Sequence, residues 1–199
     1  MPEPQPVSFE QFIRNFPQPW FDTKLRKQIK RHVKETRRCI VALDDDPTGT
    51  QTVHDIWVVT QWDGVSLRKA LADDEPAVYI LTNSRSFSLS EAQEINREIG
   101  SNLVQAARLE GRPLTIVSRS DSTLRGHYPG EVDALKESLV EAGMEPFDGV
   151  CIIPFFPEGG RFTADNIHWV LDGELLIPAA QTPYAQDHVF GYQHSHLPS

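Results

Sequence analysis

Residues 78–118 read VYILTNSRSFSLSEAQEINREIGSNLVQAARLEGRPLTIVS, and this stretch decides the fold. Its two ends, 78–81 and 114–118, are apolar runs of strand length. Between them, apolar residues recur at intervals of three and four over about 89–110, after a Ser–Glu pair with capping-box spacing and before Gly111. A helix between two apolar strands predicts a βαβ unit and a largely parallel sheet.

The same alternation continues on both sides of this stretch. An apolar run at 39–43 precedes it, and a helix opened by Pro129 and a further apolar run at 150–153 follow it. We therefore expect an α/β fold with an open, largely parallel sheet and flanking helices, Rossmann-like or flavodoxin-like. Residues 168–176, which are apolar on both sides of an Asp-Gly turn, predict a small β-hairpin in addition.

Three of the predicted strands run directly into polar residues. The first is followed by the aspartates 44–46, the second by Ser84 and Arg85, and the third by the segment 121–126. Open α/β sheets bind ligands at the carboxyl ends of their strands, so these residues are candidates for a site. Adjacent carboxylates at a strand end also need compensation by a cation or by hydrogen-bond donors. A solvated Asx-type turn at 44–46 is the alternative interpretation.

The segment 121–126, DSTLRG, contains groups suited to a polar ligand. Asp121 supplies an acceptor or a base, Ser122 and Thr123 supply hydroxyls, and Arg125 supplies a guanidinium that matches a carboxylate or a phosphate. This combination predicts a small, polar, anionic ligand.

Four segments match, in order, the motifs of one known family. Residues 45–49 match its Asp-Asp-x-Thr-Gly signature, 84–85 its Ser-Arg element, 121–126 its Asp-Ser-Thr-Leu-Arg-Gly signature, and 156–161 its Pro-Glu-x-Gly-Arg segment. The chain thus resembles the four-carbon acid sugar kinase family, in its amino-terminal, sugar-binding domain, over about residues 39–190. Four motifs in order are a specific signal.

The resemblance implies phosphorylation of a four-carbon sugar acid, such as threonate or erythronate, with ATP and Mg²⁺. It makes Asp45, Asp46 and Asp121 the candidate catalytic residues, without ranking them as the base. Arg85 and Arg125 are expected to hold the substrate carboxylate, although an ion pair with the Asp triplet or with Glu131 is the alternative. Further substrate-binding candidates are Thr48, Gly49, Ser84, Ser122, Thr123 and Gly126, with Glu158 and Arg161 as secondary candidates.

In the family, the nucleotide site lies in a second, carboxy-terminal domain. Residues 1–199 contain neither a G-x-x-x-x-G-K-[ST] loop nor a G-x-G-x-x-G turn. We therefore expect this chain to be the substrate-binding part of such a kinase, inactive by itself, with the missing nucleotide-binding domain as its partner and with no metal site of its own.

Two other functions fit parts of the sequence. Asp44-x-Asp46-x-Thr48 after an apolar run also fits the nucleophile motif of haloacid dehalogenase-like phosphatases, in which Asp44 would attack phosphorus and Asp46 would act as acid and base. The later lysine and acidic pair that this superfamily needs are not evident. The third hypothesis is a non-catalytic module that binds a sugar acid.

Residues 1–38 differ from the rest in charge. They carry a net charge of +5, whereas the whole chain carries −9. Leu25, Ile29 and Val33 recur at four-residue spacing among the basic residues, which predicts an amphipathic helix. Without an aromatic stacking platform or a DNA-binding motif we expect no nucleic acid partner, and we expect residues 1–38 to pack as an extension on a domain of residues 39–199.

Composition sets the remaining expectations. The chain has 199 residues, 39% of them hydrophobic, which is enough for a sizeable core. It has no apolar stretch of bilayer-spanning length and no signal-peptide pattern at its start, so we expect a cytoplasmic protein without a membrane partner. Cys39 and Cys151 both fall in predicted buried strands and are expected to be inert core thiols.

Overall fold

The computed structural model describes residues 4–14, 16–17 and 22–198. The chain forms two compact units, each with its own sheet. The α/β unit comprises residues 22–120 and 127–149. The antiparallel unit comprises residues 1–21, 121–126 and 150–199. The boundary expected at residue 38 stays a prediction.

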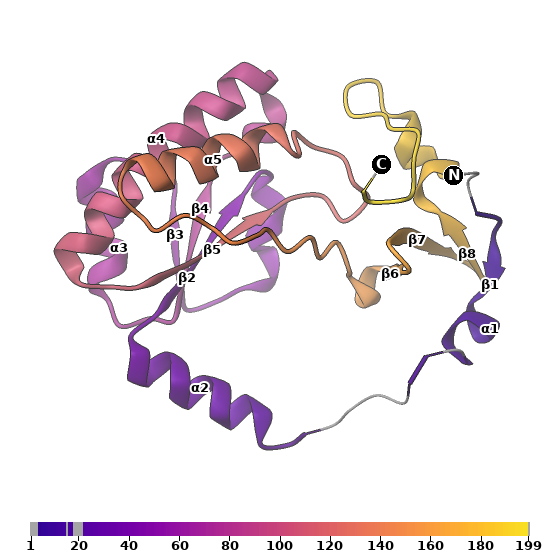
Figure 1. The fold of residues 1–199 in the computed structure, drawn as a ribbon, viewed down its shortest axis with the longest axis horizontal. Helices are drawn as coiled ribbons and strands as arrows, with labels where there is room; N and C mark the ends of the chain where they lie inside the picture. Colours follow the sequence, from indigo (N-terminus) through magenta and orange to yellow (C-terminus); the bar gives the residue numbers. More distant parts are fainter. Residues whose placement is uncertain (1–3, 15, 18–21, 199) are drawn as a thin grey trace. The chain divides into compact units, whose positions relative to one another are not determined.

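The α/β unit contains the predicted parallel sheet, in the strand order β3-β4-β2-β5 (Figure 1). β2 pairs in parallel with β4 on one side and with β5 on the other, so it is a central strand of the sheet. The predicted α/β fold class is confirmed. The strands are β2 (Cys39–Asp44), β3 (Trp57–Val59), β4 (Ala77–Leu81) and β5 (Leu114–Arg119).

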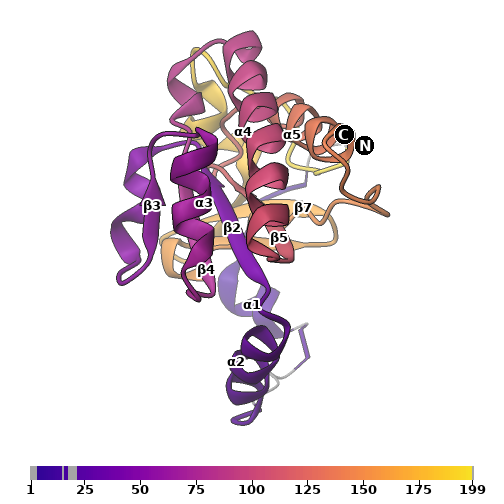
Figure 2. The ribbon, with the colours of Figure 1, turned by 90° about the vertical axis from the view of Figure 1, so that its left-hand side faces the viewer.

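Two helices, α3 and α4, connect strands of this sheet, and α5 follows its last strand; α3 packs beside α4 and α4 beside α5 (Figure 2). Their ends follow from local sequence. Asp63 caps α3 by accepting from two backbone N–H groups, and Ser88 forms a full capping box with Glu91 at the start of α4. Gly111 ends α4 in the left-handed conformation that glycine adopts without strain. The helices are α3 (Gly64–Ala72), α4 (Leu89–Glu110) and α5 (Gly130–Glu141).

The core of this unit lies between the sheet and the helices. Val41 and Ile80 of the two central strands are fully buried, as is Ile99 of α4. Burying a side chain of this size stabilises the fold by about 1.5–3 kcal/mol. α4 and α5 approach closely at Gly100, where a Cβ would meet the side chain of Ser138. The Ser138 hydroxyl there donates to a carbonyl of α4 at 2.6 Å.

The antiparallel unit contains the predicted hairpin, enlarged to four strands in the order β1-β8-β7-β6. β7 and β8 are the two arms of the hairpin, and β1 and β6 were not predicted. Phe9 at the start of α1 lies against Phe162 of β6, with ring centroids 5.2 Å apart. The elements are β1 (Val7–Ser8), α1 (Phe9–Arg14), β6 (Arg161–Ala164), β7 (Ile167–Asp172) and β8 (Leu175–Pro178).

Short 3₁₀ turns complete both units. Those of the α/β unit are η1 (Pro47–Thr52) and η2 (Ser84–Ser86). Those of the antiparallel unit are η3 (Pro157–Gly159), η4 (Ala179–Gln181) and η5 (Pro183–Gln186).

The basic helix of the amino-terminal segment forms as α2 (Leu25–Thr36). None of its residues is buried, and Ile29 of its apolar side is 54% exposed. Four-residue spacing thus indicates a helix but not a partner for its apolar side, and the expectation that residues 1–38 pack as an extension stays a prediction. No helix in the described part of the chain is both long and apolar enough to cross a bilayer.

The prediction of a strand at 150–153 is wrong. These residues form no strand, Ile153 is 76% exposed, and Cys151 is an exposed thiol and not a buried one. An apolar β-branched run indicates a preference for a strand, but a strand forms only where a neighbouring strand supplies its hydrogen bonds. Cys39, in contrast, is buried in β2 as expected.

Candidate functional site

The carboxyl ends of β2, β4 and β5 lie next to one another at one edge of the parallel sheet. Asp44, the last residue of β2, is the register partner of Leu81 in β4 and of Arg119 in β5. The loops that leave these strands therefore begin side by side. This is the edge at which open α/β sheets bind ligands.

Arg85 is held there by two aspartates of the loop after β2. Its Nε and Nη2 donate to the two carboxylate oxygens of Asp45 at 3.1 and 2.6 Å, and its Nη1 donates to Asp46 at 3.2 Å. The Ser120 hydroxyl also donates to Asp45, at 2.6 Å. The structure thus brings three predicted site residues together. For Arg85, the structure shows the ion pair with the Asp triplet, which was the alternative to a contact with the substrate carboxylate.

Asp44 and Arg119 form a second ion pair beside the first. Asp44 is fully buried, and its Oδ1 accepts from Nη1 of Arg119 at 3.0 Å. Burial raises the pKa of Asp44, although the nearby Arg119 partly offsets this. We call Asp44, Asp45, Asp46, Arg85 and Arg119 the Asp–Arg cluster. A carboxylate covered like that of Asp44 is not accessible to a phosphate ester, so the geometry is contrary to the phosphatase hypothesis.

Asp46 shapes the turn that follows β2. Its Oδ1 accepts from the backbone N–H and the hydroxyl of Thr48, at 2.7 and 2.6 Å, and these bonds hold the pKa of Asp46 below its usual value. Gly49 comes next in the turn. A Cβ there would collide with the carboxylate of Asp44 and the guanidinium of Arg119. Only glycine lets the turn close over this ion pair.

Ser84 fixes the turn that carries Arg85. Its hydroxyl donates to Oε2 of Glu131 at 2.7 Å and accepts from the hydroxyl of Thr82 at 3.2 Å. Ser84 is fully buried and Glu131 is 3% exposed. Burial therefore raises the pKa of Glu131. The sequence suggested Glu131 only as a possible partner of an arginine, whereas its hydrogen bond is to Ser84.

The segment 121–126 belongs to the antiparallel unit. There Asp121 accepts from Nε of Arg125 at 2.7 Å and from the hydroxyl of Thr123. Nη1 of Arg125 also lies 3.6 Å from Oδ2 of Asp187, a residue that was not among the predicted site residues. Arg125, like Arg85, thus pairs with aspartates of the chain in this structure.

Two side chains of the same unit hold this segment by its carbonyls. Nε2 of His168 lies 2.7 Å from the carbonyl oxygen of Ser122, and the hydroxyl of Tyr192 donates to the carbonyl oxygen of Thr123 at 2.7 Å. His168 is fully buried, which lowers its pKa, and burial raises the pKa of Tyr192 to about 12. No sequence signal marked either residue, because their partners are distant in the chain.

Tyr184 lies against two arginines of this unit, Arg125 and Arg161. The guanidinium carbons of Arg125 and Arg161 are 5.3 and 5.4 Å from the centre of its ring. Nη2 of Arg161 also donates to the Tyr184 hydroxyl at 3.2 Å. The secondary candidate Arg161 is therefore placed with Arg125, whereas Glu158 in η3 is exposed.

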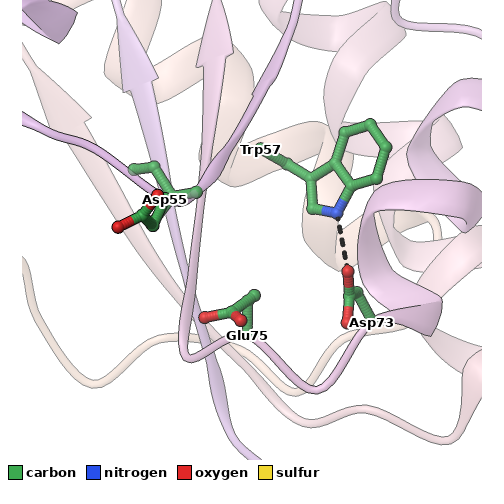
Figure 3. Close-up of a pocket in the computed structure, with 5 residues that line it drawn as sticks. Asp55, Trp57, Asp73 and Glu75 are labelled. Carbon is green, nitrogen blue, oxygen red and sulfur yellow. Dashed lines mark hydrogen bonds between the residues drawn. The ribbon is translucent and has the colours of Figure 1, made fainter.

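A pocket of about 340 Å³ lies elsewhere, among acidic residues that precede β3 and β4 (Figure 3). It is lined by Asp55, Trp57, Asp73 and Glu75, and the Trp57 indole donates to Asp73 at 3.1 Å. These residues lie at the amino ends of their strands, away from the edge with the Asp–Arg cluster. The described residues include no group of three or more His, Cys, Asp or Glu side chains arranged for a metal ion.

Comparison with known proteins identifies the family of the chain. The model of the family described as the sugar-binding N-terminal domain matches residues 40–199. The chain belongs to this family. No curated protein matches the chain in a sequence search.

Two crystal forms of one protein resemble this member of the sugar-binding N-terminal domain family. That protein is a domain of unknown function, DUF1537, from Bordetella bronchiseptica, crystallised with bound citrate as a domain-swapped dimer. The first form is 25% identical with a TM-score of 0.56, and the match covers 80% of this chain and 38% of that one. The second is 27% identical with a TM-score of 0.56, covering 81% and 39%. The chain thus spans less than two fifths of the length of these structures.

The structure places the predicted site residues in two groups, one in each unit. The residues that were not predicted are Arg119 in the α/β unit and His168, Tyr184, Asp187 and Tyr192 in the antiparallel unit, and Glu131 was predicted only as a possible partner of an arginine. Of these, Arg119 could have been found, since it directly follows an apolar strand. The α/β unit holds Asp45, Asp46, Thr48, Gly49, Ser84 and Arg85, and the antiparallel unit holds Asp121, Ser122, Thr123, Arg125, Gly126, Glu158 and Arg161.

Proposed function

We propose that this chain is the acid-binding part of an ATP-dependent kinase that phosphorylates a four-carbon sugar acid of the threonate or erythronate type. One observation carries the proposal: a sugar-binding family member has carboxylates and guanidiniums gathered at the ligand-binding edge of its sheet. Carboxylates accept hydrogen bonds from sugar hydroxyls, and a guanidinium matches a carboxylate. A polyhydroxy acid requires both kinds of partner.

The relative with bound citrate supports an acidic ligand of this size. Citrate is a small acid that carries a hydroxyl group and carboxylates. A four-carbon sugar acid presents the same groups, with more hydroxyls and a single carboxylate. The Asp–Arg cluster contains more aspartates than arginines, which suits a ligand with more hydroxyls than charges.

Within this proposal, the residues have distinct roles. Asp45 and Asp46 accept hydrogen bonds from substrate hydroxyls, and one of them takes the proton of the attacking hydroxyl; Asp121 is the other candidate for this base. Arg85 in the α/β unit and Arg125 in the antiparallel unit are the candidates for holding the carboxylate. The hydroxyl and backbone groups that complete the proposed contacts are those of Thr48, Gly49, Ser84, Ser122, Thr123 and Gly126, with Glu158 and Arg161 as secondary candidates.

The proposed reaction uses ATP and Mg²⁺. ATP would supply the phosphoryl group, and Mg²⁺ would neutralise its charge. We place this reaction in the cytoplasm. The sequence has no phosphate-binding glycine loop, and the described residues hold no group of three metal-ligating side chains. These residues therefore do not fit the nucleotide, and the roles proposed for the chain are confined to the acid.

Calorimetric titration of the chain with threonate, erythronate and ATP tests the proposal. We expect saturable heat for at least one acid with a Kd in the millimolar range, about −4 kcal/mol, and none for ATP. The uncharged four-carbon polyol threitol serves as the control and should bind more weakly, because it lacks the carboxylate. Binding of ATP without binding of either acid would contradict the proposal.

A further inference from the structure

Two arginines lie in the Asp–Arg cluster, and they differ in how their guanidiniums are used. All three guanidinium nitrogens of Arg85 donate to Asp45 or Asp46. The side chain of Arg85 is 21% exposed. A ligand carboxylate that paired with Arg85 would have to displace an aspartate from it and leave that aspartate without its partner.

Arg119 is anchored at one point. Its Nη1 donates to Asp44 at 3.0 Å, and in the described part of the chain no other side chain accepts a hydrogen bond from its guanidinium. Its side chain is 42% exposed, although Asp44 is fully buried. One nitrogen of the fork is thus fixed by a buried carboxylate, and further N–H groups remain for a ligand.

The turn after β2 is built around this arrangement. Because Gly49 has no side chain, the turn closes over Asp44 and the guanidinium of Arg119. Arg119 also lowers the pKa of Asp46 in the same turn. The guanidinium therefore lies within electrostatic range of a carboxylate proposed to accept substrate hydroxyls.

We infer that Arg119 binds the carboxylate of the acid in the α/β unit and so determines that this unit selects acids over uncharged polyols. The inference rests on the proposed function. In it, Arg119 takes the role of carboxylate partner in the α/β unit in place of Arg85, and Arg85 is a positioning residue that holds Asp45 and Asp46 for the hydroxyls. A carboxylate bound by Arg119 breaks no ion pair of the chain.

The charges of the neighbouring groups are consistent with this assignment. With all carboxylates ionised, Asp44, Asp45, Asp46 and Glu131 outnumber the two arginines and would repel an acid. Burial raises the pKa of Glu131, which disfavours its ionised form and reduces this repulsion, while the carboxylate of Asp44 is paired with Arg119.

The test is to titrate the full chain with threonate and with threitol, for the wild type and for Arg119→Gln. We expect Arg119→Gln to weaken threonate binding by about tenfold or more and to leave the response to threitol unchanged. Arg68→Gln is the matched control, because Arg68 also pairs with a partly buried carboxylate, Glu110, at 2.9 Å, but lies in α3. It should bind threonate like the wild type.

Removal of Arg119 alone leaves Asp44 buried without its partner, so the variant could unfold. The double variant Asp44→Asn/Arg119→Gln removes both charges and is expected to fold and still not to bind threonate. If a folded Arg119 variant binds threonate with wild-type affinity, the inference is overturned while the proposed function stands. If the wild type binds no acid, both are overturned.

Discussion

Arg85 and Asp45 form a bidentate ion pair that links the loops after β4 and β2, with Nη2–Oδ1 and Nε–Oδ2 distances of 2.6 and 3.1 Å. The pair joins residues 40 positions apart and fixes two loops at the edge of the sheet. Asp45 is 3% exposed, so its charge depends on this partner and on the hydroxyl of Ser120. The pair thus positions the cluster as well as stabilising it.

Arg85→Gln should therefore destabilise the chain by about 3 kcal/mol, because it leaves the buried Asp45 without its cation. Asp45→Asn/Arg85→Gln should recover part of this loss, since neither charge then remains. Urea unfolding of the single and double variants measures both effects. If the losses in the free energy of unfolding of Asp45→Asn and of Arg85→Gln, measured singly, add up to the loss of the double variant, the two side chains do not depend on each other.

Gly49→Ala should destabilise the chain by about 1–3 kcal/mol, because the new methyl group would collide with Asp44 and Arg119. Gly64→Ala is the matched control: a Cβ at Gly64, the first residue of α3, meets no atom within 4 Å. That variant should be neutral or slightly more stable than the wild type. Thermal unfolding of both variants decides, and a wild-type melting temperature for Gly49→Ala would rule out the tight packing described at this turn.

Glu131→Gln should raise the melting temperature at neutral pH. Burial raises the folded-state pKa of Glu131 above its ordinary value of 4.5. The stability that its neutral form provides is therefore fully present below pH 4.5 and is lost as the pH rises through the folded-state pKa. A glutamine carries no charge to desolvate and can still accept from Ser84. The gain is about 1 kcal/mol at neutral pH and should shrink towards pH 4.5.

The control for this change is Glu141→Gln, at the exposed end of the same helix. It should alter the melting temperature little at either pH. A Glu131→Gln variant less stable than the wild type at neutral pH would mean that the carboxylate is ionised and needed in the folded chain.

His168 gives a pH dependence of the opposite sign. Burial lowers its folded-state pKa below the ordinary value of 6.5. Its contribution to stability is therefore present above pH 6.5 and is lost as the pH falls through the folded-state pKa. The wild type should lose stability on acidification from about pH 7.5 to pH 5 more steeply than His168→Gln, whose side chain does not titrate. His32→Gln, in the exposed helix α2, should keep the wild-type slope. Identical slopes for all three proteins would contradict the buried neutral state of His168.

Features set by neighbouring residues could be predicted from the sequence. The capping box at Ser88 and the left-handed Gly111 mark the ends of α4 because each acts through contacts within a few residues. The grouping of Asp45, Asp46 and Arg85 could also be predicted, since parallel strands bring their carboxyl ends to one edge.

Features that depend on distant partners could not be predicted. Residues 150–153 have the composition of a strand but form none, and α2 has an apolar side that buries no residue. The role of Glu131 was missed for the same reason, since its partner Ser84 lies 47 positions away. Periodicity indicates which face of an element is apolar, but not what packs against it.

A nuclear magnetic resonance titration of the ¹⁵N-labelled chain with threonate shows whether the carboxyl edge of the parallel sheet binds a small sugar acid. We expect saturable shifts, with one common Kd, for the backbone amides of Asp45, Asp46, Thr48 and Gly49 and of residues 84–86 and 119–120. The amides of Asp55, Asp73 and Glu75 around the acidic pocket should not move. Shifts confined to that pocket, or no saturable shifts at the carboxyl edge, would contradict the account.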